Sequence, residues 1–456
     1  MKFKLILLLI LNFIFSQQII TEFLIIEEDT VDVFSFQIPN NYSEFNPSPL
    51  LVAFHQWGGN ENSNYSTEFD EEANSRGWFF LSPLGGSVNN YAHQEAQMYF
   101  EQEILWLKNN YPIDDKKIYM VGGSMGGATG AIYANNHLDP TKPMVAATAS
   151  GSGILDCERR AIEMDGNNSM IEWFGGEWYE VPFEYHRNSA IYFLDSTQSM
   201  HYNLQYTPLY LDFGVNEPHR THAEELYELL IDYNENMWID TEPVGSHGYS
   251  VMDENHTCNW LSQFTLIDNP NNINVNLDEP SRAYWLEAIN QNDDQNFIRI
   301  NSEINHNTII INQFSNSDTL LLHLINDSIP SSFQIMNYWN QNTITIGLTG
   351  NPTLMSFINN VEFESFNNAI WGNLIHSNNI IYIDINYGEY LISFFINDLD
   401  DINQDGMWDI LDIILLVSFI LEDSLPTYFQ FESADINNDN QLNIYDIILL
   451  VNNISN

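Results

Sequence analysis

The sequence predicts an α/β fold for its first part, with a parallel sheet covered by helices on both faces, followed by a β-rich domain and a small helical domain. Three observations carry this prediction. Apolar strands alternate with helical segments over residues 18–267, short β-type runs fill the asparagine-rich residues 268–396, and an acidic loop with a following apolar helix occurs twice in residues 397–456. A chain of 456 residues, 44% of them hydrophobic, is too long for one ordinary domain.

The formal net charge of −49, from 62 acidic and 13 basic residues, bears on the partners of the protein. No stretch of the chain is basic, so nothing would neutralise phosphates, and we expect no nucleic-acid partner. A strongly acidic surface suits a secreted protein in salty water, because salt screens the repulsion between like charges.

The N-terminus predicts export. Lys2 and Lys4 precede a short apolar run that ends near the small residue Ser16, so residues 1–17 are expected to be a secretory signal peptide. The alternative is a membrane anchor, but the apolar run is shorter than the ~20 residues that a span needs. No later segment is apolar enough to span a membrane, so we expect a secreted protein, free, on the cell surface or in a complex.

Hydrophobic patterning gives the element order of the first domain. Residues 19–38 alternate apolar and polar side chains as edge strands do, and residues 92–110 have helical spacing. Residues 221–232 predict a second helix with Thr221 as its N-cap. Further strands, some with the loop that follows, are expected in residues 48–60, 77–83, 118–121, 146–153, 208–217 and 237–242, with a closing helix at 258–264.

One stretch organises this domain. The strand 118–121 ends in Gly122-Gly123-Ser124-Met125-Gly126, a G-x-S-x-G pattern that precedes a helix start of small residues. Such a turn raises the serine hydroxyl above the sheet and directs the N–H of the next residue at an oxyanion. Glycine tolerates the close approach that the flanking positions require. The alternative is a glycine-rich turn with a bystander serine.

Two further loops complete a catalytic candidate. An α/β-hydrolase presents its triad in the order Ser, Asp or Glu, His, and this chain has Ser124, Glu217 and His247 in that order, each on a loop after a predicted strand. His247 would take the proton of Ser124, and Glu217 would orient the imidazole and stabilise its charge. Asp212 is the rival acid, but it falls inside a predicted strand. The alternative for His247 is a surface loop residue.

Residues 48–60, 118–127, 209–217 and 245–249 together resemble the secreted serine esterases of the α/β-hydrolase fold, particularly the polyhydroxybutyrate depolymerase and feruloyl esterase-like group. The resemblance covers residues 30–267 and implies an ester substrate with no cofactor for catalysis.

In this family, the strand that ends in His-Gly supplies half of the oxyanion hole. Here Gln56 follows His55, so the N–H of either Gln56 or Trp57 is expected to join that of Met125. Glu217 stands where the family usually has aspartate, a role that glutamate can fill.

Three features of the chain have two interpretations each. Cys157 and Cys258 either form a disulfide, as in many exported proteins, or remain two buried thiols. The aromatic residues of 172–202 either cap the substrate, stacking on a sugar or an aryl acid, or pack the core. The β-type runs of residues 268–396 predict a sandwich of immunoglobulin-like type, which binds carbohydrate or only spaces the ends of the chain.

The C-terminus holds two acidic loops that start 34 positions apart, at Asp401 and Asp435. Oxygen-bearing side chains at loop positions 1, 3, 5, 9 and 12, with a turn residue at position 6, predict two calcium sites of EF-hand type. The alternative is a pair of acidic solvated loops. The expected ligands are Asp401, Asn403, Asp405, Met407, Asp409 and Asp412 in the first loop, and Asp435, Asn437, Asp439, Gln441, Asn443 and Asp446 in the second.

These repeats resemble type I dockerins, which pair two such loops and bind cohesin modules on scaffold proteins. Aspartate at position 12 is usual in dockerins, and Asn440 can adopt the turn at position 6 of the second loop. The best-known cellulosomal dockerins read their cohesin with a Ser-Thr pair at positions 10 and 11, where this chain has Ile410-Leu411 and Ile444-Tyr445. The resemblance implies two calcium ions and a cohesin-like scaffold partner.

The sequence therefore predicts a secreted, modular serine hydrolase that cleaves polysaccharide-linked or other extracellular esters through an acyl-Ser124 intermediate and carries a calcium-dependent docking module. Two alternatives stay open. One is a serine peptidase of the prolyl oligopeptidase type, which shares the triad, and the other is a non-catalytic docking or adhesion protein with a degenerate hydrolase domain.

Overall fold

The computed structural model describes most of the chain. The described residues are 18–326, 330, 332–339, 343–356, 358–365, 375–377, 380–396, 402–403, 409–421, 424–426, 428–437, 439 and 441–455. The predicted signal peptide lies outside them.

The chain forms two compact units. The first comprises the described residues up to Tyr284 together with Asn290–Asn301 and Ser315–Ser317, and the second comprises the rest. The first unit therefore includes residues beyond 267, where the composition changes.

The secondary structure of the first unit alternates strands and helices. Its main strands are β1 Ile20–Ile26, β2 Asp29–Gln37, β3 Ser48–Phe54, β4 Phe79–Pro83, β5 Ile113–Gly123, β6 Ala147–Gly151, β7 Leu209–Asp212 and β8 Met237–Ile239. Its helices are α1 Phe69–Arg76, α2 Gln94–Asn110, α3 Met125–Asn136, α4 Cys157–Glu163, α5 Ile171–Phe174, α6 Pro182–Arg187, α7 Arg220–Leu230 and α8 Glu254–Leu261.

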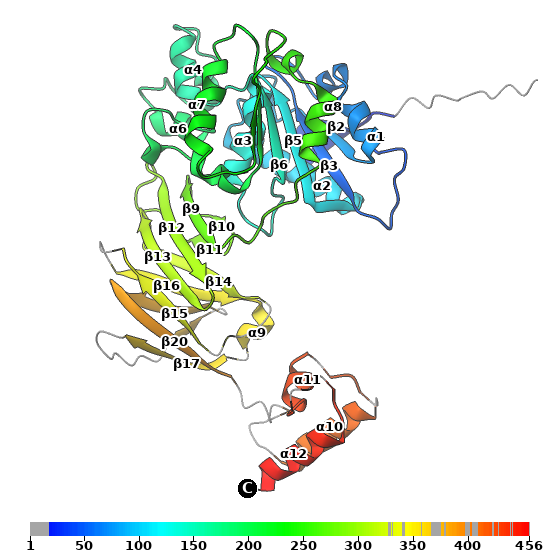
Figure 1. Ribbon diagram of the computed structural model, residues 1–456, viewed down its shortest axis with the longest axis vertical. Helices are drawn as coiled ribbons and strands as arrows, with labels where there is room; N and C mark the ends of the chain where they lie inside the picture. Colours follow the sequence, from blue (N-terminus) through cyan, green and yellow to red (C-terminus); the bar gives the residue numbers. More distant parts are fainter. Residues whose placement is uncertain are drawn as a thin grey trace, which may run out of the picture. The chain divides into compact units, whose positions relative to one another are not determined.

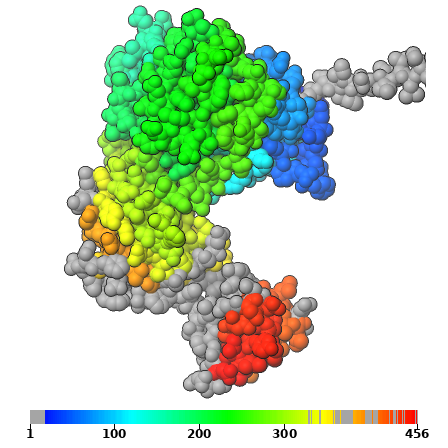
Figure 2. Space-filling model, viewed as in Figure 1, coloured from blue at the N-terminus to red at the C-terminus, as the bar shows by residue number. Residues whose placement is uncertain are grey.

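These strands form one eight-stranded sheet in the order β1-β2-β4-β3-β5-β6-β7-β8. Figure 1 labels β2, β3, β5 and β6 within this sheet. The pairs β1–β2 and β2–β4 are antiparallel, and the other neighbouring pairs are parallel. This is the strand order of the α/β-hydrolase fold, so the predicted fold class is confirmed. Figure 2 shows the space-filled surface of this unit in blue to green.

Side chains alternate between the two faces of the sheet, as β3 shows. Leu50 and Val52 belong to one apolar core, which also takes in side chains of α2, α3 and α7. Leu51 and Ala53 belong to the core on the opposite face, which includes side chains of α1 and α8. Because each buried Val or Leu side chain contributes ~1.5–3 kcal/mol, this burial sets the register of the strand.

The two cysteines lie on opposite faces of this sheet. Cys157 is buried in the core that contains Leu50, and Cys258 is buried in the core that contains Leu51. Both are free thiols. The disulfide considered from the sequence is therefore wrong, because the sheet separates the two side chains.

Two helix starts differ from the prediction. The helix predicted at 221–232 begins one residue earlier, with His219 at the N-cap position, and the Thr221 hydroxyl instead donates to the Pro218 carbonyl. The closing helix α8 begins at Glu254, because the Asp253 side chain accepts the backbone N–H of His256 and caps it.

Aromatic residues of the segment 172–202 pack into the unit. Phe174 and Tyr185 are buried in the core that contains Leu50. Phe183 packs against Phe297, with ring centroids 4.9 Å apart. For these three rings the core interpretation is confirmed.

Two further sheets follow in the chain. Their strands are β9 Asn272–Leu277, β10 Arg282–Ala283, β11 Leu286–Ala288, β12 Ile298–Asn305, β13 Thr308–Ser315, β14 Thr319–Ile325, β15 Ser332–Asn337, β16 Ile344–Gly350, β17 Ile358–Ser365, β18 Ile375–Ser377, β19 Ile380–Ile385 and β20 Gly388–Ile396, with helix α9 at Pro352–Ser356. Each sheet has six strands, in the orders β10-β11-β14-β16-β19-β18 and β17-β20-β15-β13-β12-β9. The pairs β13–β15 and β14–β16 are parallel, because the chain passes to the other sheet between the two members of each pair. The prediction of a β-rich domain is confirmed, but the immunoglobulin-like topology is wrong, since that fold is antiparallel.

The C-terminal residues form three helices, α10 Ile410–Ile420, α11 Tyr428–Ala434 and α12 Ile444–Ser455. A small apolar core joins them. Its buried members are Ile402, Leu416, Phe419, Ala434 and Leu450. No helix in the described ranges combines the length and the apolar character that crossing a membrane requires.

One buried acid in the first unit gives a test of how pH acts on stability. Glu103 of α2 is fully buried, and burial, followed by the charge of the nearby Asp32, raises its pKa well above the usual 4.5. The unfolded chain releases this proton near pH 4.5 and the folded chain holds it to higher pH, so stability falls as pH rises through that window. The Glu103→Gln variant has no carboxyl group to ionise at this position, so it should not lose stability in this way. Its melting temperature should exceed that of the wild type near pH 8 by a margin that shrinks toward pH 4, since each pKa unit corresponds to about 1.4 kcal/mol. A margin that is constant with pH would contradict the prediction.

Candidate active site and calcium loops

Ser124 occupies the sharp turn between β5 and α3. Its backbone has φ 57° and ψ −119°, a conformation that costs an L-residue ~1–3 kcal/mol. The glycines on either side make the turn sterically feasible. A Cβ on Gly122 would lie 2.0 Å from the Gly126 carbonyl oxygen, and one on Gly126 would lie 2.3 Å from the Phe54 carbonyl oxygen. The strand, turn and helix expected from the G-x-S-x-G pattern are therefore present.

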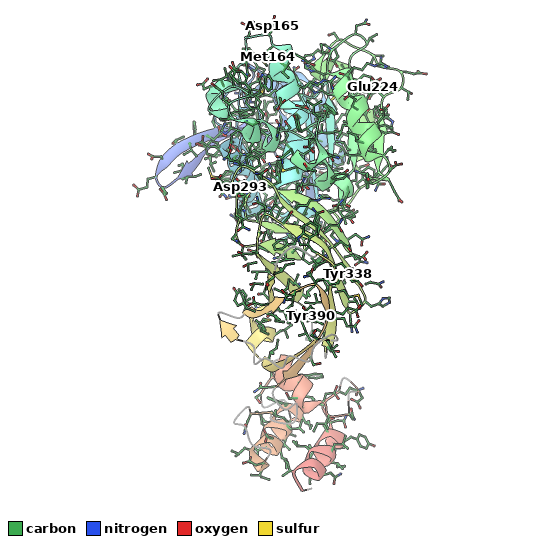
Figure 3. All side chains as sticks on the ribbon, turned by 90° about the vertical axis from the view of Figure 1, so that its left-hand side faces the viewer. Met164, Asp165, Glu224, Asp293, Tyr338 and Tyr390 are labelled. Carbon is green, nitrogen blue, oxygen red and sulfur yellow. The ribbon has the colours of Figure 1, made fainter. Side chains whose placement is uncertain are left out.

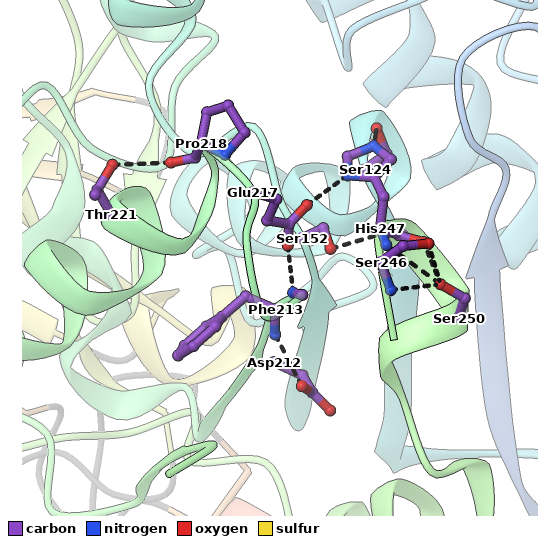
Figure 4. A network of polar contacts seen from close by, with 12 residues as sticks. Ser124, Ser152, Asp212, Phe213, Glu217, Pro218, Thr221, Ser246, His247 and Ser250 are labelled. Carbon is purple, nitrogen blue, oxygen red and sulfur yellow. Dashed lines mark hydrogen bonds and ion pairs between the residues drawn. The ribbon is translucent and has the colours of Figure 1, made fainter. Parts of the chain in front are cut away.

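The structure brings the three candidate triad residues together from separate loops (Figure 4). The Ser124 Oγ lies 2.7 Å from His247 Nε2, and His247 Nδ1 lies 2.6 Å from Glu217 Oε2. Ser124 is 6% exposed, while the His247 side chain is 43% exposed and that of Glu217 only 5%. The imidazole is thus accessible from solvent, while the serine and the acid are largely shielded from water.

The two acids that the sequence offered have opposite electrostatic environments. Burial would raise the pKa of Glu217, but hydrogen bonds from His247, Ser152 and the Gly214 N–H outweigh it, and the pKa is lowered. Burial, followed by the charge of Asp240, raises the pKa of Asp212 to about 8. Glu217 is therefore ionised at neutral pH and Asp212 is mostly protonated, and only Glu217 contacts His247.

Ser152 also belongs to this network, although its role was not predicted from the sequence. Its side-chain oxygen accepts the backbone N–H of Gly248 at 2.9 Å, which fixes the loop that carries His247, and its hydroxyl also contributes to the low pKa of Glu217. Ser152 itself adopts φ 55°. The signal available was the Gly151-Ser152-Gly153 turn after a predicted strand, which resembles the turn at Ser124.

The predicted oxyanion hole requires backbone N–H groups that are not already donated to another acceptor. The N–H of Ser124 itself donates to the Gly151 carbonyl at 2.7 Å and is not available. Those of Met125, Gln56 and Trp57 donate to no carbonyl or side chain within the described part of the chain. The His55 ring holds this segment, since its two nitrogens lie 2.8 Å and 2.9 Å from the carbonyl oxygens of Gln56 and Leu84.

The two C-terminal loops share one hydrogen-bond pattern around the aspartate at position 12. Asp412 accepts the N–H of Asn403 at 2.9 Å with one oxygen and that of Asp409 at 3.0 Å with the other. Asp446 accepts the N–H of Asn437 at 3.4 Å and that of Asn443 at 2.8 Å. Of the predicted ligands, Asp401, Asp405 and Met407 lie outside the described residues.

The donor set of these loops suits calcium. Asp412 and Asp446 are fully buried, Asp435 is 6% exposed, and all three present carboxylate oxygens, the ligand type that Ca²⁺ prefers. In the second loop, the N–H of Asp439 points back to Asp435 Oδ1 at 3.0 Å, so the chain turns tightly around these oxygens. The geometry fits loops that wrap a cation.

Comparison with solved structures gives likenesses that cover about half of the chain. A fluorophosphonate-binding serine hydrolase of Staphylococcus aureus shares 14% identity at a TM-score of 0.43, covering 54% of this chain and 98% of its own. An S-formylglutathione hydrolase from Staphylococcus aureus shares 14% at 0.42, covering 54% and 99%. A ferulic acid esterase shares 14% at 0.40, covering 55% and 96%.

Sequence comparisons cover a smaller part of the chain. No curated protein matches it. Residues 399–455 match the family model of the dockerin type I domain, which confirms the resemblance inferred from the repeat.

Proposed function

We propose that the protein is a secreted serine esterase that hydrolyses carboxylic esters through an acyl-Ser124 intermediate. The observation that carries this proposal is the continuous chain of contacts from Ser124 Oγ through His247 to the ionised Glu217, at 2.7 Å and 2.6 Å. Such a chain has no evident structural purpose on an exposed loop, whereas nucleophilic catalysis requires it.

The chemistry follows from this geometry. Ser124 Oγ attacks the carbonyl carbon of the ester while His247 Nε2 takes its proton, and Glu217 stabilises the imidazolium that forms. The N–H of Met125, with that of Gln56 or Trp57, binds the oxyanion. His247 then returns the proton to the leaving alkoxide, and a water molecule deprotonated by His247 releases the acid from Ser124.

The C-terminal domain favours the hypothesis that the substrate ester lies on or near a polysaccharide. A dockerin type I match at residues 399–455 implies a cohesin-like scaffold as partner, with two calcium ions in the paired loops. The helices expose matching apolar side chains, which are 49–66% exposed and related by 34 positions. We propose that they contact the scaffold. They are Ile410, Leu411 and Ile414 on α10 and Ile444, Tyr445 and Ile448 on α12.

A substrate panel tests the activity. The full chain should hydrolyse p-nitrophenyl acetate and butyrate, and the comparison of methyl ferulate with acetylated xylan should identify the acyl group it prefers. A proline-containing amide should not be cleaved. Cleavage of the amide alone would favour the peptidase alternative, and no turnover with any substrate, together with no labelling by a fluorophosphonate probe, would contradict the proposed activity.

Exchanging the two candidate acids should separate their roles. Glu217→Gln removes the charge that orients and stabilises the imidazole, so kcat/KM for p-nitrophenyl acetate should fall by about 10⁴-fold. Asp212→Asn is the matched control. Asp212 is already mostly protonated at neutral pH and accepts the Phe213 N–H at 2.8 Å, a contact that asparagine keeps. Its activity should stay within about twofold of the wild type, and a loss as large as that of Glu217→Gln would contradict the assignment.

A further inference from the structure

Glu163, His219 and His222 gather beside the catalytic loops. Glu163 ends α4, His219 caps α7, and His222 lies in the first turn of that helix. Each offers one ligand atom, and the three atoms lie within 4.8 Å of one another. In Figure 3, the label Met164 locates the end of α4, because Met164 directly follows Glu163. The label Glu224 locates α7.

Each of the two imidazoles has one ring nitrogen without a hydrogen-bond partner among the described residues. His219 is 4% exposed and its Nδ1 has no hydrogen-bond partner within the described residues. His222 is fully buried, and its Nε2 likewise has none there, since the nearest carboxylate oxygen of Glu163 is 3.6 Å away. Burying a polar nitrogen without a partner costs about 1–3 kcal/mol, so two in one place indicate a missing partner.

The chemistry of the three side chains suits a cation, because their ligand atoms converge on one place. Two imidazoles and one carboxylate form the ligand set that zinc and related transition metals prefer.

Three contacts compete with a metal at this place. Glu163 also lies 3.7 Å from Arg159 Nε and 3.4 Å from an Arg160 guanidinium nitrogen. The N–H of Asp156 faces His222 Nδ1 at 3.4 Å, a long contact that would be lost when Nε2 coordinates a metal and the ring proton moves to Nδ1. These contacts predict moderate affinity and not the tight binding of a closed structural site.

We propose that Glu163, His219 and His222 bind a divalent transition metal ion of the zinc type. The ion bonds to the carboxylate and to one nitrogen of each imidazole, and water completes its coordination shell. It joins the end of α4 to the start of α7.

The site adjoins the triad without sharing its residues. The His219 ring centroid lies 5.3 Å from that of His247, and Glu217 precedes His219 by two positions. A metal here would therefore restrain the loop that carries the catalytic acid. The proposal does not depend on the proposed esterase activity, since its readouts are binding and stability.

The test is a titration of Zn²⁺ into the full chain, with calcium present to occupy the C-terminal loops. Calorimetry should give one zinc site in the wild type, Zn²⁺ should raise the melting temperature, and Co²⁺ should give the visible absorption of a nitrogen- and oxygen-ligated ion. Glu163→Gln and His222→Gln should each weaken zinc binding by about tenfold or more. Glu225→Gln is the matched control, because Glu225 also pairs with Arg159, at 3.0 Å, but lies outside the cluster.

The outcomes separate clearly. Loss of the zinc site in Glu163→Gln with its retention in Glu225→Gln would support the proposal even if His222→Gln, a change at a buried position, does not fold. Equal zinc binding by the wild type and Glu163→Gln would place the ion elsewhere and overturn it. Absence of zinc binding by the wild type would overturn it as well.

Discussion

Replacing Ser124 with alanine is expected to remove ester turnover, with kcat/KM for p-nitrophenyl acetate falling by about 10⁶-fold. The reason is that no other hydroxyl in the described structure contacts His247 Nε2, so the variant has no nucleophile to accept the acyl group. The residual rate should come from the oxyanion donors and from substrate binding alone. Labelling by a fluorophosphonate probe should disappear in parallel, because the probe needs the same hydroxyl.

A matched serine shows whether this loss is specific. Ser75 of α1 is exposed and donates only to the carbonyl of Glu72, so Ser75→Ala should keep full turnover and full labelling. Both variants should have the far-UV circular dichroism spectrum of the wild type. Their melting temperatures should differ from that of the wild type only by the small effect of losing one hydroxyl group. If Ser124→Ala kept more than about one hundredth of the wild-type rate, the acyl group would have to be carried by another residue.

The sequence predicted the candidate triad because its signals are local and ordered. The Gly122 and Gly126 positions are fixed by close backbone contacts. Ser124, Glu217 and His247 lie one, five and eight residues after the ends of β5, β7 and β8. Parallel strands of one sheet end at the same edge, so three separate loops converge without any knowledge of long-range contacts. The choice of Glu217 over Asp212 also followed from this rule.

What the sequence could not predict depends on contacts between distant residues. The contact between Ser152 and Gly248 joins positions 96 residues apart, and no periodicity encodes it. The opposite placement of Cys157 and Cys258 follows from which face each helix covers. The cluster of Glu163 with two histidines of α7 likewise forms only when α4 and α7 meet.

The middle of the chain shows a different limit. Short β-type runs predict strands, but the parallel pairing of β13 with β15 arises from a strand of the other sheet that lies between them in sequence. Alternating hydrophobicity specifies which side of a strand is buried and not which strand is its neighbour. The presence of strands was therefore easier to predict than their order.

Removing calcium should have the second large effect, confined to the C-terminal helices. At a calcium concentration of 100 times Kd, each site would stabilise the folded domain by about 2.7 kcal/mol, and a chelator should abolish this contribution. The small core of Ile402, Leu416, Phe419, Ala434 and Leu450 offers little to replace it. Without the cation, the buried carboxylates of Asp412 and Asp446 would keep only their backbone N–H partners.

Unfolding of the full chain is measured with and without calcium. The three readouts are the circular dichroism signal of the helices, proteolysis after residue 396 and capture on a cohesin-type scaffold. With chelator, the last helices should melt and capture should be lost, while ester turnover stays unchanged because the triad lies in the first unit. Asp446→Ala should reproduce part of this loss, and Asp293→Ala, an exposed acid outside the loops, should not. A cation whose binding energy contributes to folding cannot be removed without a loss of stability. If α10 and α12 stayed folded and bound the scaffold without calcium, the two loops would therefore be acidic turns that bind no cation.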